Sequence, residues 1–383
     1  MKNWKIWMLA VMLAVACKKP YNPGVINSPQ SYLIVEGTIV TNDVTTVKLS
    51  KTVNLSSTTT TNPVTGAVLT VEADNNSSYA LTEQAPGTYT LTGAGLDIAR
   101  KYRLRIKTVD NKEYLSDFEQ AKATPPIDSI GYKILSNGIS IYANSHDPNN
   151  NTHYYRFDYT ETWKFHSKYQ SNYMSNGDSI VSRPQDQMIY YCFANNTSST
   201  ILLGSTAKLT QDVLYQTPIT QIAGNSEKIE IKYSILLHEY ALSADAYKFW
   251  GNLKKNTEQL GSIFDAEPSQ ISGNIHNIKD PTEVVVGYIS SGTVQTKRVF
   301  ISNQDLPTTF LTDYPYDCGI DSDWYDHPKT HINDVAVVLI PKQEIPISAF
   351  SVGFAIAGYT ASTPACIDCT LRGSTQQPDF WKN

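Results

Sequence analysis

Short segments in which apolar and polar residues alternate at a period of two recur along this chain, and this pattern constrains its fold more than any other feature. Residues 154–163 show it clearly, because Tyr155, Phe157 and Tyr159 fall on one face of an extended chain, followed by Glu161. The polar side chains of the opposite face are Arg156, Asp158 and Thr160. Alternation at this period is typical of β-strands that bury one face. We therefore predict a mainly β fold.

The first part of the folded chain, residues 32–123, is predicted to be a β-sandwich of the immunoglobulin-like or transthyretin-like kind. Its strand segments follow one another at spacings of about 8 to 12 residues with Pro, Gly, Asn and Asp between them, as in all-β sandwiches. The predicted strands are 32–37, 46–50, 68–73, 87–91, 102–108 and 113–116. Pro125 and Pro126 mark the boundary, because proline cannot donate a hydrogen bond to a sheet.

A larger β-rich domain with one prominent helix is predicted for residues 124–383. Its main strand segments are 127–130, 139–142, 154–163, 283–289, 297–302, 334–340 and 350–356. The helix is predicted near residues 243–258, with Ser243 as its N-cap. The apolar face of this helix consists of Ala246, Phe249, Trp250 and Leu253. We interpret the two aromatic rings as packing against a sheet rather than as a platform for a ligand.

The N-terminus predicts export and lipid anchoring. Two lysines precede an apolar stretch of roughly 11 residues, which has the order of a secretory signal and is too short to span a bilayer of about 30 Å. Cys17 follows the small residues of Leu13-Ala14-Val15-Ala16, as in a lipoprotein signal. We predict a signal peptide at 1–16, lipidation of Cys17 and a flexible tether over 17–31. The alternative is an ordinary signal peptide followed by a chance cysteine.

The residue after Cys17 bears on the destination. Lys18 stands where an inner-membrane retention signal would favour Asp. We therefore predict that the protein is anchored to the outer membrane of the cell envelope, with the leaflet left open.

The cysteines beyond Cys17 are predicted to form disulfides. They are even in number and would lie in an oxidising compartment, which favours two disulfides in any of three pairings. These residues are Cys192, Cys318, Cys366 and Cys369. The Cys-x-x-Cys spacing of the last two also occurs in zinc sites, but one such pair with two scattered partners is a poor match. A thioredoxin-like role is disfavoured, since no βαβ pattern surrounds the pair.

Several segments resemble one known family. They are His-Glu-Tyr-Ala-Leu-Ser-Ala-Asp-Ala-Tyr-Lys-Phe-Trp at 238–250, Ile-Ser-Gly-Asn-Ile at 271–275, Cys-Ile-Asp-Cys-Thr at 366–370, Pro-Asp-Phe-Trp at 378–381, and the segments 33–37 and 47–50. The chain thereby resembles the Bacteroidota lipoproteins of the family called domain of unknown function 4249. The resemblance implies an envelope protein, often encoded beside TonB-dependent outer-membrane receptors, without an established activity. It supplies no catalytic residues.

The sequence contains few residue patterns that indicate catalysis or ligand binding. The formal net charge of -5 provides no basic stripe for nucleic acid. Neither a Gly-x-Ser-x-Gly elbow nor a His-Glu-x-x-His zinc helix is present. The acidic residues Asp317, Asp321, Asp323 and Asp326 surround Cys318 and are an alternative calcium site, although the EF-hand glycine and glutamate are missing. Aromatic residues that could stack on sugars are Trp163, Tyr169, Tyr173, Tyr190 and Tyr191.

These observations favour a binding function. We predict a non-enzymatic accessory lipoprotein that is held at the membrane by its lipid anchor and associates with a TonB-dependent receptor or another envelope protein. No cofactor is predicted. The first alternative is a surface lipoprotein that binds a glycan or another ligand in a concave pocket. The second is a hydrolase whose nucleophile and base come together from distant loops.

Overall fold

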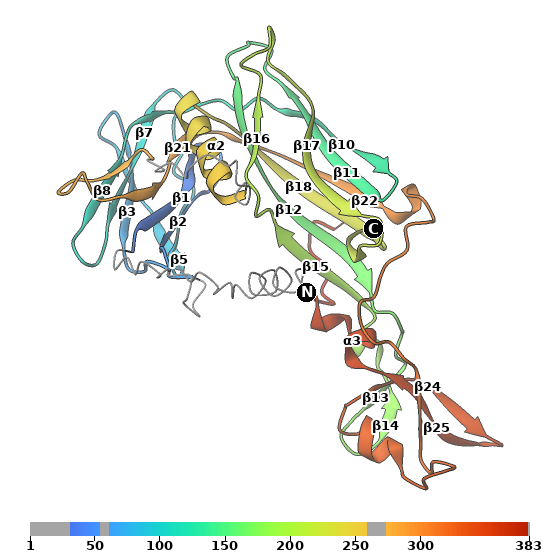
Figure 1. Cartoon of the computed structure of the whole chain (residues 1–383). Helices are drawn as coiled ribbons and strands as arrows, with labels where there is room; N and C mark the ends of the chain where they lie inside the picture. Colours follow the sequence, from blue (N-terminus) through green and yellow to red (C-terminus); the bar gives the residue numbers. More distant parts are fainter. Residues whose placement is uncertain (1–30, 54–60, 259–272, 382–383) are drawn as a thin grey trace, which may run out of the picture.

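The computed structural model describes residues 31–53, 61–258 and 273–381. Strands predominate in these ranges and form facing sheets that enclose apolar side chains (Figure 1). The mainly β fold predicted from the sequence is therefore confirmed. The predicted signal peptide at 1–16 and Cys17 lie outside the described residues. Within those ranges no helix combines the length and the apolar character needed to cross a bilayer.

The first sandwich contains the strands expected between residues 32 and 123. One sheet has the order β20-β1-β2-β6-β5, and β21 also pairs with β1. Its strands are β1 (Leu33–Val40), β2 (Thr45–Lys51), β5 (Thr82–Ala85), β6 (Thr88–Leu91), β20 (Val285–Gly287) and β21 (Ser290–Gly292). The facing sheet has the order β19-β8-β7-β3-β4, and β9 also pairs with β7. Its strands are β3 (Val68–Ala73), β4 (Ser78–Ala80), β7 (Lys101–Lys107), β8 (Glu113–Ser116), β9 (Glu119–Gln120) and β19 (Ile275–Asn277).

Three strands of this sandwich come from much later in the chain. The predicted range of 32–123 was therefore incomplete. Strands β20 and β21 lie parallel to β1, and β19 lies antiparallel to β8. Ile275, Val285 and Ile289 join the apolar core of this sandwich. Parallel neighbours need a long connection between them, so their pairing leaves no local hairpin pattern in the sequence. Residues 275–292 therefore belong with the first sandwich.

A second sandwich follows. One of its sheets has the order β10-β11-β17, with β10 (Ile127–Leu135), β11 (Gly138–His146) and β17 (Val213–Ala223). The other has the order β15-β12-β18-β22, and β16 also pairs with β12. Its strands are β12 (Tyr154–His166), β15 (Tyr191–Thr197), β16 (Leu202–Ser205), β18 (Lys232–Ala241) and β22 (Val294–Ser302). Tyr155 and Phe157 of β12 are buried between the two sheets, as their alternation predicts.

A small subdomain projects from the end of the second sandwich (Figure 1). It pairs β13 (Tyr173–Ser175) with β14 (Ile180–Ser182), and it contains a sheet of order β23-β25-β24. The strands of that sheet are β23 (Asp321–Trp324), β24 (Ile345–Val352) and β25 (Ala355–Ser362). The sequence did not predict this unit as separate. Its apolar core includes Ile180, Val335 and Tyr359, which lie far apart in the chain.

Two strand predictions in this subdomain are wrong. Residues 334–340 form a π-helical turn at Val335–Leu339, in which the Ile340 amide donates to the Val335 carbonyl at 3.0 Å. A short apolar run cannot be assigned to helix or strand by its period alone. The predicted strand 350–356 is interrupted by a turn at Gly353, whose φ of +65° is readily adopted by glycine.

The predicted helix near 243–258 is confirmed as α2 (Ala244–Glu258). Ser243 Oγ accepts a hydrogen bond from the Ala246 amide at 3.2 Å, which is the expected N-cap contact. Figure 1 shows α2 between the two sandwiches. The remaining helical elements are short, namely α3 (Pro364–Ile367) and 3-10 turns at Gln185–Gln187, Glu227–Ile229, Asn303–Asp305 and Cys369–Leu371.

Candidate functional site

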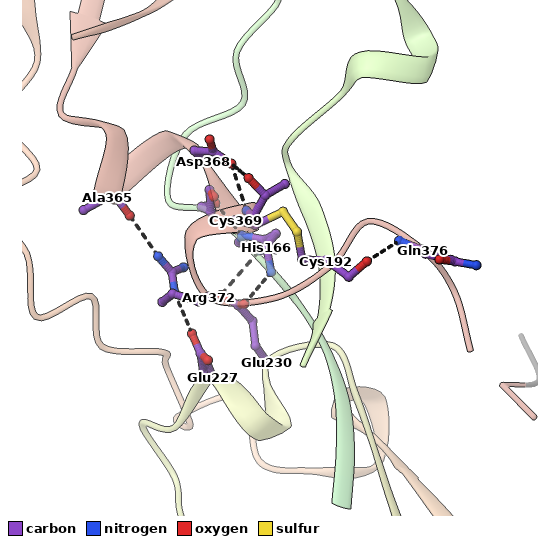
Figure 2. The surroundings of a disulfide bond; sticks show 12 residues. His166, Cys192, Glu227, Glu230, Ala365, Asp368, Cys369, Arg372 and Gln376 are labelled. Atoms are coloured by element: carbon purple, nitrogen blue, oxygen red, sulfur yellow. Dashed lines mark hydrogen bonds and ion pairs between the residues drawn. A yellow bond between two sulfur atoms is a disulfide. The ribbon is translucent and has the colours of Figure 1, made fainter. Parts of the chain in front are cut away.

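The cysteines form disulfides as expected, and the structure selects one of the three pairings. Cys192 is bonded to Cys369 (Figure 2), and Cys318 is bonded to Cys366. The two cysteines of the Cys-x-x-Cys segment therefore have different partners. This pairing leaves neither of them as a thiolate for the alternative zinc site, and it does not form a disulfide within the motif.

A polar cluster surrounds the Cys192–Cys369 disulfide. The Tyr314 hydroxyl donates to a Glu230 carboxylate oxygen and lies 3.2 Å from His166 Nδ1. The His166 amide donates to the other oxygen of Glu230 at 2.8 Å. Burial and the bond to Glu230 raise the pKa of Tyr314 above its ordinary value. The tyrosine thus stays neutral and acts as a hydrogen-bond donor.

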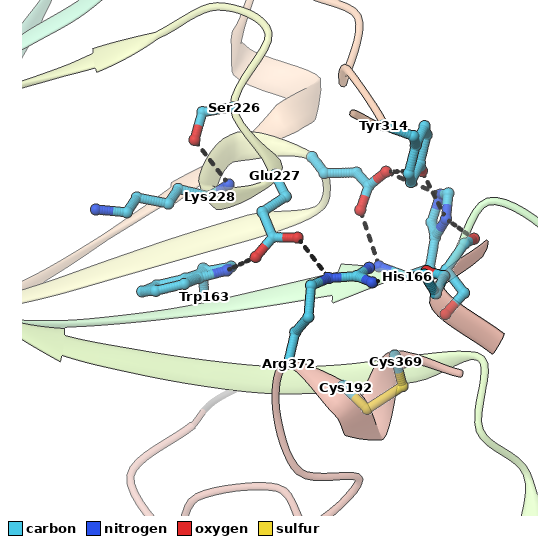
Figure 3. Close-up of polar contacts among 12 residues, drawn as sticks. Trp163, His166, Cys192, Ser226, Glu227, Lys228, Tyr314, Cys369 and Arg372 are labelled. Carbon is cyan, nitrogen blue, oxygen red and sulfur yellow. Dashed lines mark hydrogen bonds and ion pairs between the residues drawn. A yellow bond between two sulfur atoms is a disulfide. The ribbon is translucent and has the colours of Figure 1, made fainter. Parts of the chain in front are cut away.

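The C-terminal tail is held by a second set of contacts beside this cluster. Glu227 accepts hydrogen bonds from Trp163 Nε1 at 3.3 Å and from Arg372 Nε at 3.2 Å, and Figure 3 shows it between these partners. A further Arg372 nitrogen donates to the Ala365 carbonyl at 2.9 Å. The guanidinium also lies over the Phe165 ring, 5.2 Å from its centroid. These contacts explain how a polar tail packs on the second sandwich.

The residue that follows His166 joins the same cluster through its backbone. This residue is Ser167, and its side chain is fully buried. The ring nitrogen Nδ1 of His166 already contacts the Ser167 carbonyl at 2.7 Å. We therefore interpret the cluster as a structural fastening of the tail.

The alternative calcium residues do not converge. The carbonyl of Asp317 accepts a hydrogen bond from Thr363 Oγ1 at 3.2 Å, whereas Asp326 Oδ1 lies 3.1 Å from His331 Nδ1. Asp321 begins β23, and Asp323 is buried two residues later. Among the residues that the structure describes, no group of three or more His, Cys, Asp or Glu side chains is placed to hold a metal ion.

The aromatic residues considered for sugar stacking also lie apart. Trp163 is buried, and Tyr173 packs against the core of the small subdomain. Tyr169 is half-buried and donates its hydroxyl to the Cys318 carbonyl at 2.9 Å. Tyr190 and Tyr191 are neighbours with ring centroids 4.6 Å apart, and only the second is well exposed. They do not form one exposed row.

A candidate site is formed by a cleft between the two sandwiches. It has a volume of about 680 Å³ and is bounded by the outer face of β1 and β2, by β12 and β18, and by α2. A pocket of this size falls in the range of small-ligand sites. Thr124 connects the two sandwiches, because its amide donates to Thr293 Oγ1 at 2.8 Å and its hydroxyl accepts from the Ala241 amide at 3.0 Å.

One wall of this interdomain cleft centres on Arg156. Its guanidinium carbon lies 4.5 Å from the ring centroid of Tyr240 and 4.9 Å from that of Trp250, so it stacks on both rings. One of its terminal nitrogens is 3.4 Å from Asp158 Oδ2. His238 Nδ1 lies 2.8 Å from the other oxygen of Asp158. The cationic group is thereby held at the surface of the cleft.

The same contacts determine the charge of this wall. Burial alone would raise the pKa of Asp158, but the hydrogen bond with His238 and the charge of Arg156 outweigh it and lower the pKa. Burial, reinforced by the negative charge of Asp158, raises the pKa of Tyr240. At neutral pH this wall therefore carries an ionised carboxylate, a guanidinium and a neutral phenol.

The facing wall has charges of both signs. Glu36 of β1 is paired in register with Lys48 of β2, and both side chains are exposed. Hydroxyl groups border the cleft at Thr38 and Thr46 and along residues 197–200. The site therefore combines apolar, hydroxyl and ionic groups on opposed surfaces.

The sequence anticipated part of this site. The polar face of residues 154–163 was predicted, and it is the face that meets the cleft. Trp250 was interpreted as helix packing, yet it is half-buried and lines the cleft, whereas Phe249 is buried. Tyr240, Glu36 and Lys48 were not singled out. The alternation of β1 and β2 is enough to place Glu36 and Lys48 on the same outer face of their sheet. It does not show that this face lies opposite Arg156.

The fold and the cleft define a class of protein in which tandem β-sandwiches enclose a binding-sized space. The chain belongs to the family described as domain of unknown function (DUF4249), whose model matches residues 18–298. No curated protein matches the chain. A solved two-domain fibronectin type-III segment from chicken tenascin is similar over 56% of this chain and 93% of that chain, with 10% identity and a TM-score of 0.18.

Proposed function

We propose that the protein is a lipid-anchored component of the bacterial cell envelope that acts by binding and not by catalysis. Its partner is a TonB-dependent receptor or another envelope protein, and a polypeptide segment of that partner occupies the interdomain cleft. The signal-like N-terminus with Cys17 supports the anchor. Confinement to a membrane raises the effective concentration of the protein against partners held in the same membrane.

The observation that carries the proposal is the composition of the cleft. Its walls offer apolar surface from Ile34 and Leu253, hydroxyl groups, and charges of both signs at Glu36, Lys48 and Arg156. A polypeptide presents the same mixture, with backbone donors and acceptors between side chains of varied character. The volume of about 680 Å³ admits a short segment rather than a folded domain.

A glycan fits this cleft less well. Sugar rings stack on open aromatic faces, but the guanidinium of Arg156 already stacks on Tyr240 and Trp250. An enzymatic role also has less support at the cluster around His166, since its Nδ1 already contacts the Ser167 carbonyl and the Ser167 side chain is buried. Binding of a partner segment would use the apolar, hydroxyl and charged residues of the cleft together, and it therefore explains the lining better than a glycan or an enzymatic role does.

The test is affinity purification of a tagged chain from outer membrane in mild detergent, followed by mass spectrometry. The cleft variant is Lys48→Glu, which reverses a charge on one wall and should lower recovery of the partner about tenfold, as expected for loss of a charge pair in a partly enclosed site. The matched control is Lys107→Glu, which makes the same change at an exposed position of β7, in the other sheet of the first sandwich. We expect the control to recover the partner like the wild type.

Two results would overturn the proposal. One is recovery of the tagged chain alone under conditions that preserve other envelope complexes. The other is equal recovery of the partner with Lys48→Glu and wild type, which would place the contact outside the cleft.

A further inference from the structure

The small subdomain ends in a projecting β-hairpin. Strands β24 and β25 pair from Ile345 with Ser362 at the base to Val352 with Ala355 at the end, and Gly353 and Phe354 form the turn. In Figure 1 this hairpin extends away from the rest of the subdomain. Its end is therefore free to meet another surface.

The end of the hairpin is apolar and fully accessible. Every residue from 351 to 356 is exposed, and these include Val352 at 64%, Ile356 at 51% and the completely exposed Phe354. Single exposed apolar residues are common on proteins, but a projecting group of three exposed apolar residues is not. We call the residues 351–356 the hairpin tip.

The hairpin also lacks charge. The sequence contains no Asp, Glu, Lys or Arg from Ile345 to Ile367. Solvent-exposed hairpins usually carry charged residues that prevent edge-to-edge association. Their absence here keeps the desolvation cost of the whole hairpin low.

Aromatic residues stand directly behind the tip. The ring of Trp324 packs edge-on against Phe350 at a centroid separation of 4.8 Å, and Trp324 is paired in register with Gly358 of β25. Tyr325 follows and is exposed. An apolar end backed by Trp and Tyr is the distribution found at membrane–water interfaces, where these rings prefer the level of the lipid headgroups.

A lipid surface suits this shape better than a protein surface does. Specific protein interfaces bury roughly 800 Å² and about 20 to 30 residues on each partner, which a narrow convex tip cannot supply by itself. A bilayer adapts to any shape, and shallow burial by about 5 to 10 Å leaves the hairpin edges among hydrated headgroups that satisfy their backbone groups.

We propose that the hairpin tip inserts into the interfacial region of a lipid bilayer, through Val352, Phe354 and Ile356, with Trp324 and Tyr325 at headgroup level. This contact is separate from the lipid anchor and from the interdomain cleft. It orients the small subdomain against the membrane. The chemical class of its ligand is a zwitterionic or neutral phospholipid surface, because the hairpin carries no cationic group for anionic lipids.

The experiment uses the mature chain, residues 17–383, carrying Cys17→Ala, so that neither an acyl chain nor the apolar signal segment contributes, and vesicles of phosphatidylcholine and phosphatidylethanolamine. Vesicle flotation should recover this chain, and Phe354→Asp should reduce the bound fraction about tenfold, because a charge resists burial in the interface. Val109→Asp is the matched control, since Val109 is 72% exposed in a turn of the first sandwich. Phe354 covers no other residue, so its replacement should leave the melting temperature unchanged.

A second measurement locates the contact. Lipids brominated near the headgroup should quench the tryptophan fluorescence of the bound chain, and Trp324→Phe should abolish that quenching while retaining flotation. The proposal is overturned if the Cys17→Ala chain does not float with vesicles, or if Phe354→Asp and Val109→Asp behave alike. Loss of an envelope partner with Phe354→Asp, without any flotation of the parent chain, would instead assign the tip to a protein site. None of these outcomes depends on Lys48 or the cleft.

Discussion

Cys192 is bonded to Cys369 across a sequence separation of 177 residues, with their Cα atoms 5.7 Å apart. The bond joins β15 to the 3-10 turn that begins the C-terminal tail. Directly after it, the amide and carbonyl of Phe193 exchange hydrogen bonds with Ser374, both at 2.8 Å. Trp381 then packs edge-on against the Phe193 ring at 5.1 Å. The tail thus forms an added edge of the second sandwich.

The first prediction concerns this bond. Removing it with Cys192→Ala and Cys369→Ala should lower the free energy of unfolding by about 2 to 5 kcal/mol, because the unfolded chain regains the freedom of a long loop. Urea denaturation followed by circular dichroism measures the change. The Cys318–Cys366 disulfide closes a loop of only 48 residues. Its removal should lower the free energy of unfolding by about 1 kcal/mol less than removal of Cys192–Cys369 does. A larger loss from the shorter loop would contradict the entropic account.

The second prediction concerns Glu239 of β18. Its side chain is fully buried in the second sandwich, where Ser145 Oγ donates to one carboxyl oxygen at 2.7 Å. Burial, with smaller contributions from Asp128 and Asp212, raises its pKa from 4.5 to about 8. The folded protein therefore keeps this carboxyl protonated at neutral pH, whereas the unfolded chain releases the proton.

The sign of the pH dependence follows from linkage. The folded state binds more protons than the unfolded state between pH 4.5 and about 8, so the contribution to stability is complete below pH 4.5 and declines as the pH rises to about 8. Glu239→Gln cannot titrate and should flatten this decline. Melting temperatures of wild type and Glu239→Gln, measured from pH 5 to 9, test this expectation. The control is Asp186→Asn, because Asp186 is exposed. Parallel curves for wild type and Glu239→Gln would refute the assignment.

The third prediction concerns the start of α2. Ser243→Ala should lower the free energy of unfolding by about 1 kcal/mol, since the Ala246 amide loses its acceptor. Ser243→Thr retains an oxygen at the same place and should recover most of that stability. Chemical denaturation of the three proteins at one pH decides between them. Equal stability of Ser243→Ala and wild type would contradict the prediction, because it would mean that water satisfies the Ala246 amide as well as the Ser243 hydroxyl does.

Sequence reasoning succeeded where the determining contacts are local. The alternation of residues 154–163 and the apolar spacing of α2 each reflect one element packed on one surface. It failed for residues 334–340, because a run of valines fits either a strand or a buried helical turn until its neighbours are known. The parallel pairing of β20 and β21 with β1 was missed since it depends on residues more than 240 positions apart.

The cleft illustrates a different limit. Its walls are drawn from β1, β2, β12, β18 and α2, and from residues 197–201. Strands were predicted in the regions of β1, β2 and β12 and a helix at α2, but no strand was predicted at β18. No pattern in the sequence relates Glu36 to Arg156. Only the packing of one sandwich against the other brings them to the same space. The disulfide pairing has the same character, because four cysteines permit three pairings and their spacing does not choose among them.

The last prediction is that Cys17 carries lipid. The segment Leu13-Ala14-Val15-Ala16-Cys17 has the order of a lipoprotein signal, and a diacylglyceryl group would provide the two acyl chains that stable anchoring requires, whereas one chain binds only reversibly. Metabolic labelling with an alkynyl palmitate should therefore mark the wild type and leave Cys17→Ala unmarked. Cys369→Ala is the matched control, since it also removes one cysteine but should keep the label. Fractionation should find the wild type firmly in the membrane. Equal labelling of wild type and Cys17→Ala would rule out this anchor.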